Sequence, residues 1–155
     1  MIEQINNYLV RPANKKDSKR IWEIRNHPIS RKYSGNSEKI FFARHNLWFK
    51  NKYFNGQDNY CFVLKSKDGL VVGYCRLDLD NINNYYIISI AIDPNHHGQG
   101  LGHRLMRDTL SQFARWRKGI FAEIKKENLG SIRLFQKNNF KIFKEDEKNY
   151  YLKHK

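Results

Sequence analysis

The sequence predicts an α/β fold, and a strand followed at once by a helix carries most of that prediction. Residues 85–92 are rich in Ile and Tyr, which suits a buried strand, and Asp93-Pro94-Asn95 ends it because proline cannot donate to a sheet ladder. Beyond residue 100, apolar side chains recur at the spacing of an amphipathic helix. They belong to Leu101, Leu105, Met106, Leu110, Phe113 and Trp116.

The segments before residue 85 predict two more helices and another strand. Asp17 or Ser18 can cap a helix that runs to about residue 25, where Asn26-His27-Pro28 ends it because the residue before a proline disfavours helical geometry. A second helix is predicted over residues 43–53. Residues 70–80 alternate between apolar and polar side chains, which is typical of a strand.

The length of 155 residues predicts one domain, residues 1–155, that buries roughly two thirds of its unfolded surface. No apolar run approaches the roughly 20 residues that span a bilayer, and Met1-Ile2-Glu3-Gln4 is too polar to begin a signal peptide. We therefore expect a cytoplasmic protein with no membrane partner.

Without an export signal, Cys61 and Cys75 are expected to be free core thiols, although they could sit opposite one another on paired strands. No metal site is expected, because His96-His97 lacks partners at ligand spacing.

The formal net charge of +14 has two interpretations. A positive field speeds encounters with polyanionic ligands, a class that includes nucleic acids. The alternative is compositional drift, because Lys and Asn are spread over the whole chain. Residues 115–118 and 125–126 are only short basic clusters, and no compact basic stripe with interleaved aromatic residues appears. We favour drift and do not expect a nucleic-acid partner.

The most informative stretch is His97-Gly98-Gln99-Gly100-Leu101-Gly102, which lies between the predicted strand and helix. The first N–H groups of a helix have no partner within it, the helix dipole is positive there, and missing Cβ atoms let a diphosphate approach the main chain. The spacing fits neither the P-loop nor the dinucleotide-binding fingerprint. A glycine-rich turn without a ligand is the alternative.

This turn resembles the acetyl-CoA-binding motif of the GCN5-related N-acetyltransferase (GNAT) family. In that motif, Gln or Arg is followed by two variable residues, Gly, one variable residue, and Gly or Ala. The family motif follows a strand that ends in a hydrophobic residue, Asp and Pro, as Ile92-Asp93-Pro94 does here. His97 stands where the family has Gln or Arg, which weakens a side-chain contact and leaves a cradle of backbone groups.

A second family signature lies downstream, where the family has a short helix beside the pantetheine arm and then a strand. Asn139 stands where the family usually has glycine, and asparagine is the next best residue for the left-handed position that stops a helix. By themselves these residues also fit an ordinary short helix with an apolar face. The matching residues are Asn128, Ser131, Leu134, Phe135 and Phe140.

The resemblance implies a mixed sheet of six to seven strands, splayed at a central parallel pair over residues 85–92 and 120–124, with helices on both faces. Acetyl-CoA, as cosubstrate, would lie in the wedge between those strands and pair with backbone near residue 90. An amine would attack its thioester directly. The implied cofactor-binding residues are Ile90, Ala91, Ile92, His97, Gly98, Gln99, Gly100, Leu101, Gly102, His103, Asn128, Ser131 and Phe135.

Two departures from the family leave the proton transfers open. Phe135 occupies the place of a tyrosine thought to protonate the leaving thiolate, and Ile87 occupies the place of a common glutamate base. Tyr150 is the candidate donor instead. Strand parity puts Arg76 and Asp78 on one face, which makes Asp78 the candidate base and Arg76 the candidate contact to an anionic acceptor. A solvated ion pair is the alternative.

Segments 22–28, 45–49 and 73–78 resemble the acetyltransferases that modify amino sugars carried on nucleotides, such as the pseudaminic-acid pathway enzymes. They imply a small-molecule amine acceptor, in a monomer or homodimer. A protein N-terminal acetyltransferase of the ribosomal-protein type and a noncatalytic acyl-CoA-binding module are the alternatives. The implied substrate-binding residues are Arg25, Asn26, His45, Trp48 and Arg76, of which His45 and Trp48 also fit a core.

Overall fold

The computed structural model describes residues 7–113 and 118–155, and the predicted helical position Trp116 lies outside them. The strands are β1 (Tyr8–Pro12), β2 (Tyr60–Ser66), β3 (Val71–Asp80), β4 (Tyr85–Ile92), β5 (Ile120–Lys125), β6 (Phe140–Glu145) and β7 (Asn149–His154). The helices are η1 (Lys15–Asp17), α2 (Ser18–Asn26), α3 (Pro28–Tyr33), α4 (Phe42–Phe54), η2 (Pro94–His96), α5 (Leu101–Gln112) and α6 (Leu129–Lys137).

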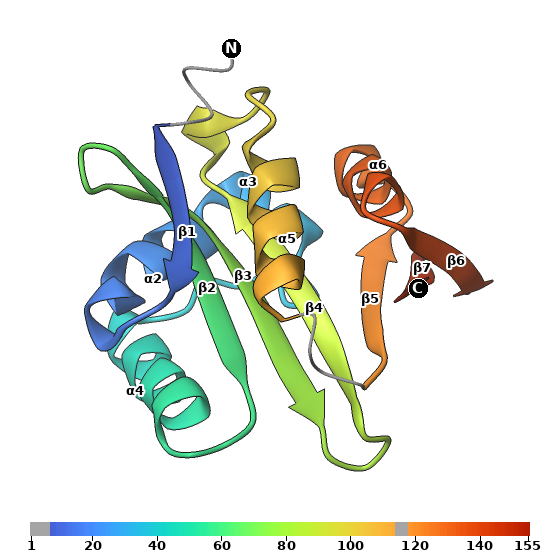
Figure 1. Ribbon diagram of the computed structural model, residues 1–155, viewed down its shortest axis with the longest axis horizontal. Coiled ribbons are helices and arrows are strands. Elements are labelled where there is room, and N and C mark those ends of the chain that lie inside the picture. Colours follow the sequence, from blue (N-terminus) through green and yellow to red (C-terminus); the bar gives the residue numbers. More distant parts are fainter. Residues whose placement is uncertain (1–6, 114–117) are drawn as a thin grey trace.

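The strands form one sheet in the order β1-β2-β3-β4-β5-β7-β6. The β4–β5 pair is parallel and the other pairs are antiparallel, which confirms the predicted mixed sheet. The described β4–β5 ladder has two register pairs, Tyr86 with Ile120 and Ile87 with Phe121. Beyond them the two strands diverge toward the end of β4, as Figure 1 shows. The sheet is therefore splayed at its central parallel pair.

Helices cover both faces of the sheet, as predicted, and each face has its own core (Figure 1). On one face, α5 and α6 pack through residues such as Leu105 and Phe135 against the even-numbered side chains of β4. On the other face, α2 and α4 pack through Ile21, Ile24 and Phe49. The strand parity predicted for β3 is confirmed, because Cys75 and Leu77 belong to the first core and Tyr74 to the second.

The helix predicted to end at Asn26-His27-Pro28 does end there, but a second helix that was not predicted begins at once. Pro28 is the first residue of α3, where its missing N–H costs nothing and its fixed φ suits a helix. The His27 side chain accepts a hydrogen bond from the Ile29 N–H at 3.1 Å and so caps α3. The same proline therefore closes one helix and opens the next.

Cys61 and Cys75 are free and buried, but they do not sit opposite one another. The register pairs Cys61 with Arg76 and Cys75 with Phe62, so the two thiols lie on opposite faces of the sheet. Burial raises the pKa of the Cys75 thiol to about 12, so it stays protonated.

The helices that the structure describes, over residues 7–113 and 118–155, include none with the length and apolar character of a membrane span.

Candidate active site

The glycine turn opens at the N-terminus of α5. Gly98 and Gly100 have φ values of 79° and 73°, in the left-handed region that other residues rarely adopt, and Gly100 is the N-cap of α5. A Cβ atom at either position would meet nothing within 4 Å, so the turn faces open space. At Gly102, by contrast, a Cβ would lie 3.1 Å from Leu134 Cδ2, so this glycine lets α5 approach α6.

The side chains of His97 and His103 are both engaged within the protein. His97 Nε2 lies 2.9 Å from the Ile92 carbonyl oxygen, which ties the turn back to the end of β4. His103 Nδ1 lies 3.1 Å from Asn138 Nδ2, and burial together with nearby Lys137 lowers the pKa of His103. If His97 and His103 bind the cofactor as predicted, their backbone groups would make the contacts. Their role in cofactor binding remains a prediction.

Asp93 fastens this turn to α2, a link that the sequence did not reveal. Asp93 is 6% exposed, accepts a hydrogen bond from the Asn95 N–H at 3.0 Å and forms an ion pair with Arg20. Arg20 Nε also donates to the Val71 carbonyl at 2.7 Å. Burial alone would raise the pKa of Asp93, but the Asn95 N–H and Arg20 outweigh it and lower the pKa.

The second signature forms the start and the core side of α6. Asn128 caps this helix, with its Oδ1 accepting from the Ser131 N–H at 3.2 Å. Asn139 has the left-handed φ of 69° that the sequence predicted. Phe135 is 3% exposed and packs edge to face on Phe140, at 4.9 Å between ring centroids. Phe135 thus lies in the core shared by α5 and α6 and carries no proton to donate.

Tyr150, the candidate proton donor, lies on β7 opposite Ile124 and packs against the same core as Phe135. Lys126 Nζ lies 5.2 Å from the Tyr150 ring centroid. The described residues contain no group of three or more His, Cys, Asp or Glu side chains that could hold a metal ion. The role of Tyr150 as proton donor stays a prediction.

Four of the five predicted substrate-binding residues gather on the other face of the sheet. Trp48 of α4 has the guanidinium carbons of Arg25 and Arg76 at 4.9 Å and 5.3 Å from its ring centroid. His45 lies next to Trp48, at 5.6 Å between ring centroids. The fifth residue, Asn26, is tied to the loop before α4: its amide donates to the Ile40 carbonyl at 2.7 Å and accepts from the Ile40 N–H at 3.0 Å.

Asp78 belongs to the same group of side chains, and its carboxylate is already engaged. Tyr53 donates its hydroxyl to Asp78 Oδ1 at 2.6 Å, while Arg76 Nη1 and Lys52 Nζ lie 3.5 Å and 3.7 Å from Oδ2. Lys52 Nζ is also 5.7 Å from the Trp48 ring centroid. The three cations Arg25, Lys52 and Arg76 thus gather around the Trp48 ring, and two of them, Lys52 and Arg76, pair with the one carboxylate, Asp78. This set, with Trp48, is hereafter the Trp48 cluster.

The two arginines of the cluster respond to their surroundings in opposite directions, since against the effect of burial Tyr53 and Asp78 raise the pKa of Arg76. Burial and the field of Arg76 both lower the pKa of Arg25. Arg76 Nε is buried and has no hydrogen-bond partner among the described residues. The Trp48 cluster is therefore suited to an anionic ligand group, which would supply both the missing charge and an acceptor.

His45 is expected to make the protein less stable in acid. It is 1% exposed, and burial, with Arg25 second, lowers its pKa from 6.5 to about 4, although a backbone group of Ser18 acts in the other direction. The unfolded chain takes up this proton below pH 6.5 and the folded protein only near pH 4. Over that interval we expect the free energy of unfolding to fall by about 3 kcal/mol from this group.

Urea unfolding at pH 7 and pH 4 measures this loss. The variant His45→Phe removes the titrating group and should lose correspondingly less stability between the two pH values, whereas replacing the exposed His97 by Gln should leave the wild-type loss unchanged. Parallel losses in wild type and His45→Phe would contradict the assignment.

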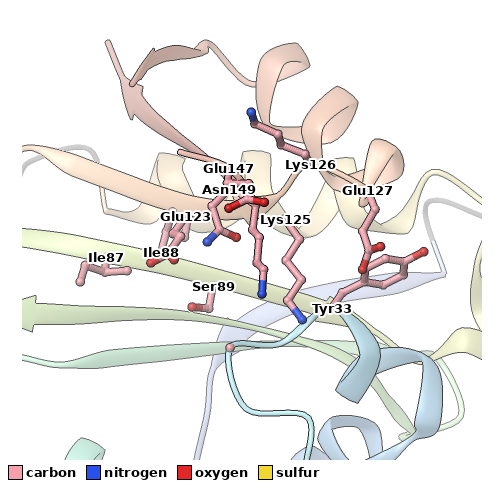
Figure 2. A pocket seen from close by; sticks show the side chains of 12 residues that line it. Tyr33, Ile87, Ile88, Ser89, Glu123, Lys125, Lys126, Glu127, Glu147 and Asn149 are labelled. Carbon is pink, nitrogen blue, oxygen red and sulfur yellow. The ribbon is translucent and has the colours of Figure 1, made fainter. Parts of the chain in front are cut away.

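A pocket of about 850 Å³ lies on the same face as the Trp48 cluster, where β4 and β5 diverge (Figure 2). The register sets Arg76 beside Ser89 and Asp78 beside Ile87, so the cluster borders the pocket through β3 and β4. Most of the lining comes from residues that the sequence did not single out. They are Tyr33, Gly35, Ile87, Ile88, Ser89, Glu123, Lys125, Lys126, Glu127, Glu147, Lys148 and Asn149.

These residues could not be recognised from sequence because they converge only through long-range pairing. Glu123 and Lys125 lie on β5, Asn149 lies on β7, and their antiparallel register brings them to one face of the sheet. Lys125 Nζ donates to the Lys32 carbonyl at 3.0 Å, which joins β5 to α3. The only signal available was the two-residue alternation of β5, with Ala122 and Ile124 buried.

Comparison with known proteins identifies the family. The model of the acetyltransferase (GNAT) family matches residues 20–140, a span that includes the glycine turn, the wedge and α6. The chain belongs to the GNAT family. This GNAT protein also has a solved structural neighbour, a putative acetyltransferase from Salmonella typhimurium with its cofactor acetyl-CoA. The TM-score is 0.79 with 22% identity over 96% of this chain and 93% of that chain, which confirms the GNAT fold.

Two curated relatives of this GNAT chain have named activities. An L-methionine sulfoximine/L-methionine sulfone acetyltransferase from Salmonella typhimurium is 26% identical over 139 residues, 86% of this chain and 80% of the relative. The L-amino acid N-acyltransferase MnaT from Escherichia coli is 26% identical over 141 residues, 86% of this chain and 79% of the relative. They are named for amino acids or amino acid derivatives, so these relatives do not support the nucleotide-linked amino sugar that the sequence predicted.

Proposed function

We propose that this GNAT acetyltransferase transfers an acetyl group from acetyl-CoA to the primary amine of a small acceptor that carries an anionic group. The observation that carries the proposal is the Trp48 cluster, which holds three cations and one carboxylate beside the pocket. A carboxylate or phosphate on the acceptor would balance this charge. The amine would then point along the pocket toward the wedge between β4 and β5.

The glycine turn and the wedge fit acetyl-CoA. Gly98 and Gly100 leave the N-terminus of α5 open to a diphosphate, and Gly102 lets α6 pack close beside it. The short β4–β5 ladder leaves the β4 backbone from Ser89 onward without a partner on β5, so amide groups of the pantetheine arm could pair there. The cosubstrate would supply the acetyl thioester, and the chain would bind it, exclude water and receive the protons.

Amino acids are the acceptor class that the relatives favour, since both are named for amino acids or their derivatives. A nucleotide-linked amino sugar remains the second candidate, because the pocket of about 850 Å³ lies near the upper end of the range for small-ligand sites. Both classes offer a primary amine and an anionic group. The charge of the Trp48 cluster therefore does not distinguish the two acceptor classes. The size of the acceptor that the pocket accepts would distinguish them.

Release of free thiol from acetyl-CoA, measured against a panel of amines, tests the proposal. The panel holds L-methionine sulfone, other L-amino acids, a nucleotide-linked amino sugar, an N-terminal peptide and spermidine. We expect turnover with acceptors that carry a carboxylate or phosphate near the amine, and little with spermidine, which brings only positive charge. A preference for spermidine over every anionic acceptor would contradict the proposal.

Arg76→Ala is expected to raise the acceptor KM by about tenfold, with little change in kcat or in acetyl-CoA affinity, because it removes a contact made equally before and during the reaction. Tenfold corresponds to about 1.4 kcal/mol of binding free energy. Steady-state kinetics with an acceptor from the panel measures it. Arg44→Ala, an exposed arginine on α4 outside the Trp48 cluster, is the matched control. An unchanged KM in Arg76→Ala would mean that the anionic group binds elsewhere.

A further inference from the structure

The pocket wall formed by β4 has no group that could accept a proton from the amine. Ile87 lines the pocket and is 39% exposed, and by its resemblance to the family it stands where a glutamate base is common. Asp78, its neighbour on β3, is held by Tyr53, Arg76 and Lys52. Both oxygens of this carboxylate are therefore already in contact with other side chains. The base must therefore come from another wall.

The opposite wall offers Glu123. Ile87 pairs with Phe121 at the end of the parallel ladder, and Glu123 is the next residue of β5 on the same face. Glu123 therefore stands across the widening wedge from Ser89, and both side chains line the pocket, as Figure 2 shows. Glu123 is exposed, and among the described residues its carboxylate has no hydrogen bond or ion pair. Unlike the carboxylate of Asp78, that of Glu123 is not held by other side chains.

The groups around Glu123 are already committed or lie farther along the pocket. Its cross-strand partner on β7, Tyr151, donates its hydroxyl to Asp146 at 2.7 Å. The ammonium group of Lys125 donates a hydrogen bond to the Lys32 carbonyl, and Lys126 Nζ lies 3.4 Å from Glu145 Oε2. The remaining titratable or charged lining groups are Tyr33, Glu127, Glu147 and Lys148.

We propose that Glu123 is the general base of the acetyl transfer, acting from β5 in place of a carboxylate on β4. The assignment rests on the proposed function. Glu123 removes one proton from the acceptor's ammonium group, the neutral nitrogen attacks the thioester carbonyl carbon, and the carbon–sulfur bond breaks. The second nitrogen proton goes to the leaving thiolate to give coenzyme A, and Glu123 returns its proton to water. The products are the amide, coenzyme A and one proton.

Glu123→Gln tests the assignment because it keeps the size and removes the base. With an acceptor from the panel, kcat/KM should fall by about 100-fold, and its decline toward low pH should no longer follow a single ionisation. The Kd of acetyl-CoA should stay within twofold. Asp68→Asn, in the exposed turn between β2 and β3 and outside the pocket lining, should leave the kinetics unchanged. Restoring a carboxylate on β4, with Ile87→Glu in the Glu123→Gln background, should recover at least tenfold, whereas Ile87→Gln should not.

Slow hydrolysis of acetyl-CoA without any acceptor gives a second readout, since water then replaces the amine as nucleophile. Because this assay needs no acceptor, it tests the role of Glu123 independently of the proposed acceptor class. Failure of every acceptor would contradict the proposed function, while a hydrolysis rate that falls at least tenfold in Glu123→Gln would still support the base. Equal rates of hydrolysis and transfer in wild type and Glu123→Gln, or loss of the ionisation only in Asp78→Asn, would overturn it.

Discussion

Gly100→Glu is expected to weaken acetyl-CoA binding at least 100-fold while the protein stays folded. Gly100 is the N-cap of α5, where the helix dipole and unpaired N–H groups would meet the diphosphate. A Cβ at this position meets nothing within 4 Å, so a side chain fits, but it places a carboxylate where the ligand's own negative charge must lie. The loss therefore comes from charge and occupied space and not from unfolding.

Isothermal calorimetry measures the affinity, and Gly56→Glu supplies a matched control. Gly56 has nearly the same left-handed φ, 74°, and also has nothing within 4 Å of a built Cβ, but it follows α4 on the other side of the sheet. Both variants carry the same backbone strain of about 1 to 2 kcal/mol. Unchanged coenzyme A affinity in a folded Gly100→Glu protein would show that the diphosphate does not bind at the glycine turn.

Asp93→Ala is expected to lower the free energy of unfolding by about 3 kcal/mol. The change leaves Arg20 without its buried partner and the Asn95 N–H without its acceptor. Because the ion pair joins α2 to the turn before α5, the variant should also bind acetyl-CoA more weakly. The lowered pKa of Asp93 predicts a related loss of stability in wild type as pH falls through that pKa, below the ordinary carboxyl value.

Urea unfolding at neutral pH tests the prediction, and Glu23→Ala is its control. Glu23 is the other carboxylate on Arg20, at 3.2 Å, but it is 43% exposed on its side chain. An exposed pair contributes at most about 1 kcal/mol, so this variant should be nearly as stable as wild type. Equal losses in the two variants would mean that the Arg20–Asp93 pair does not fasten the turn.

Patterns within a few neighbouring residues were enough to predict the strands and helices that bury one apolar face. The strand β4 and the start of α5 fall where apolar periodicity and Pro94 placed them, because burial and a missing N–H act within a few residues. The strand β1 and the helix α3 escaped prediction. Five residues of β1 hold no strong period, and Pro28 reads equally well as an end or a beginning.

The site divides in the same way. The glycine turn is local in sequence and was recognised at once, whereas the Arg20–Asp93 pair joins residues 73 apart and the pocket joins α3, β4, β5 and β7. Such groupings depend on sheet order, which no periodicity reveals. Even where parity placed Arg76 and Asp78 correctly on one face, it could not tell that Tyr53 and Lys52 would occupy the carboxylate.

The two register pairs between β4 and β5 have a consequence for how the molecule holds together. They are the whole described main-chain seam between a four-stranded half, β1 to β4, and a three-stranded half, β5 to β7. Side chains of α5, α6 and the shared core, together with the hydrogen bond from Lys125 to the Lys32 carbonyl, contribute the other described contacts across this line. A ligand that lies in the wedge with its own amide groups would serve as an additional strand. The weakest line of the sheet is thus also the place where a bound molecule adds the most cohesion.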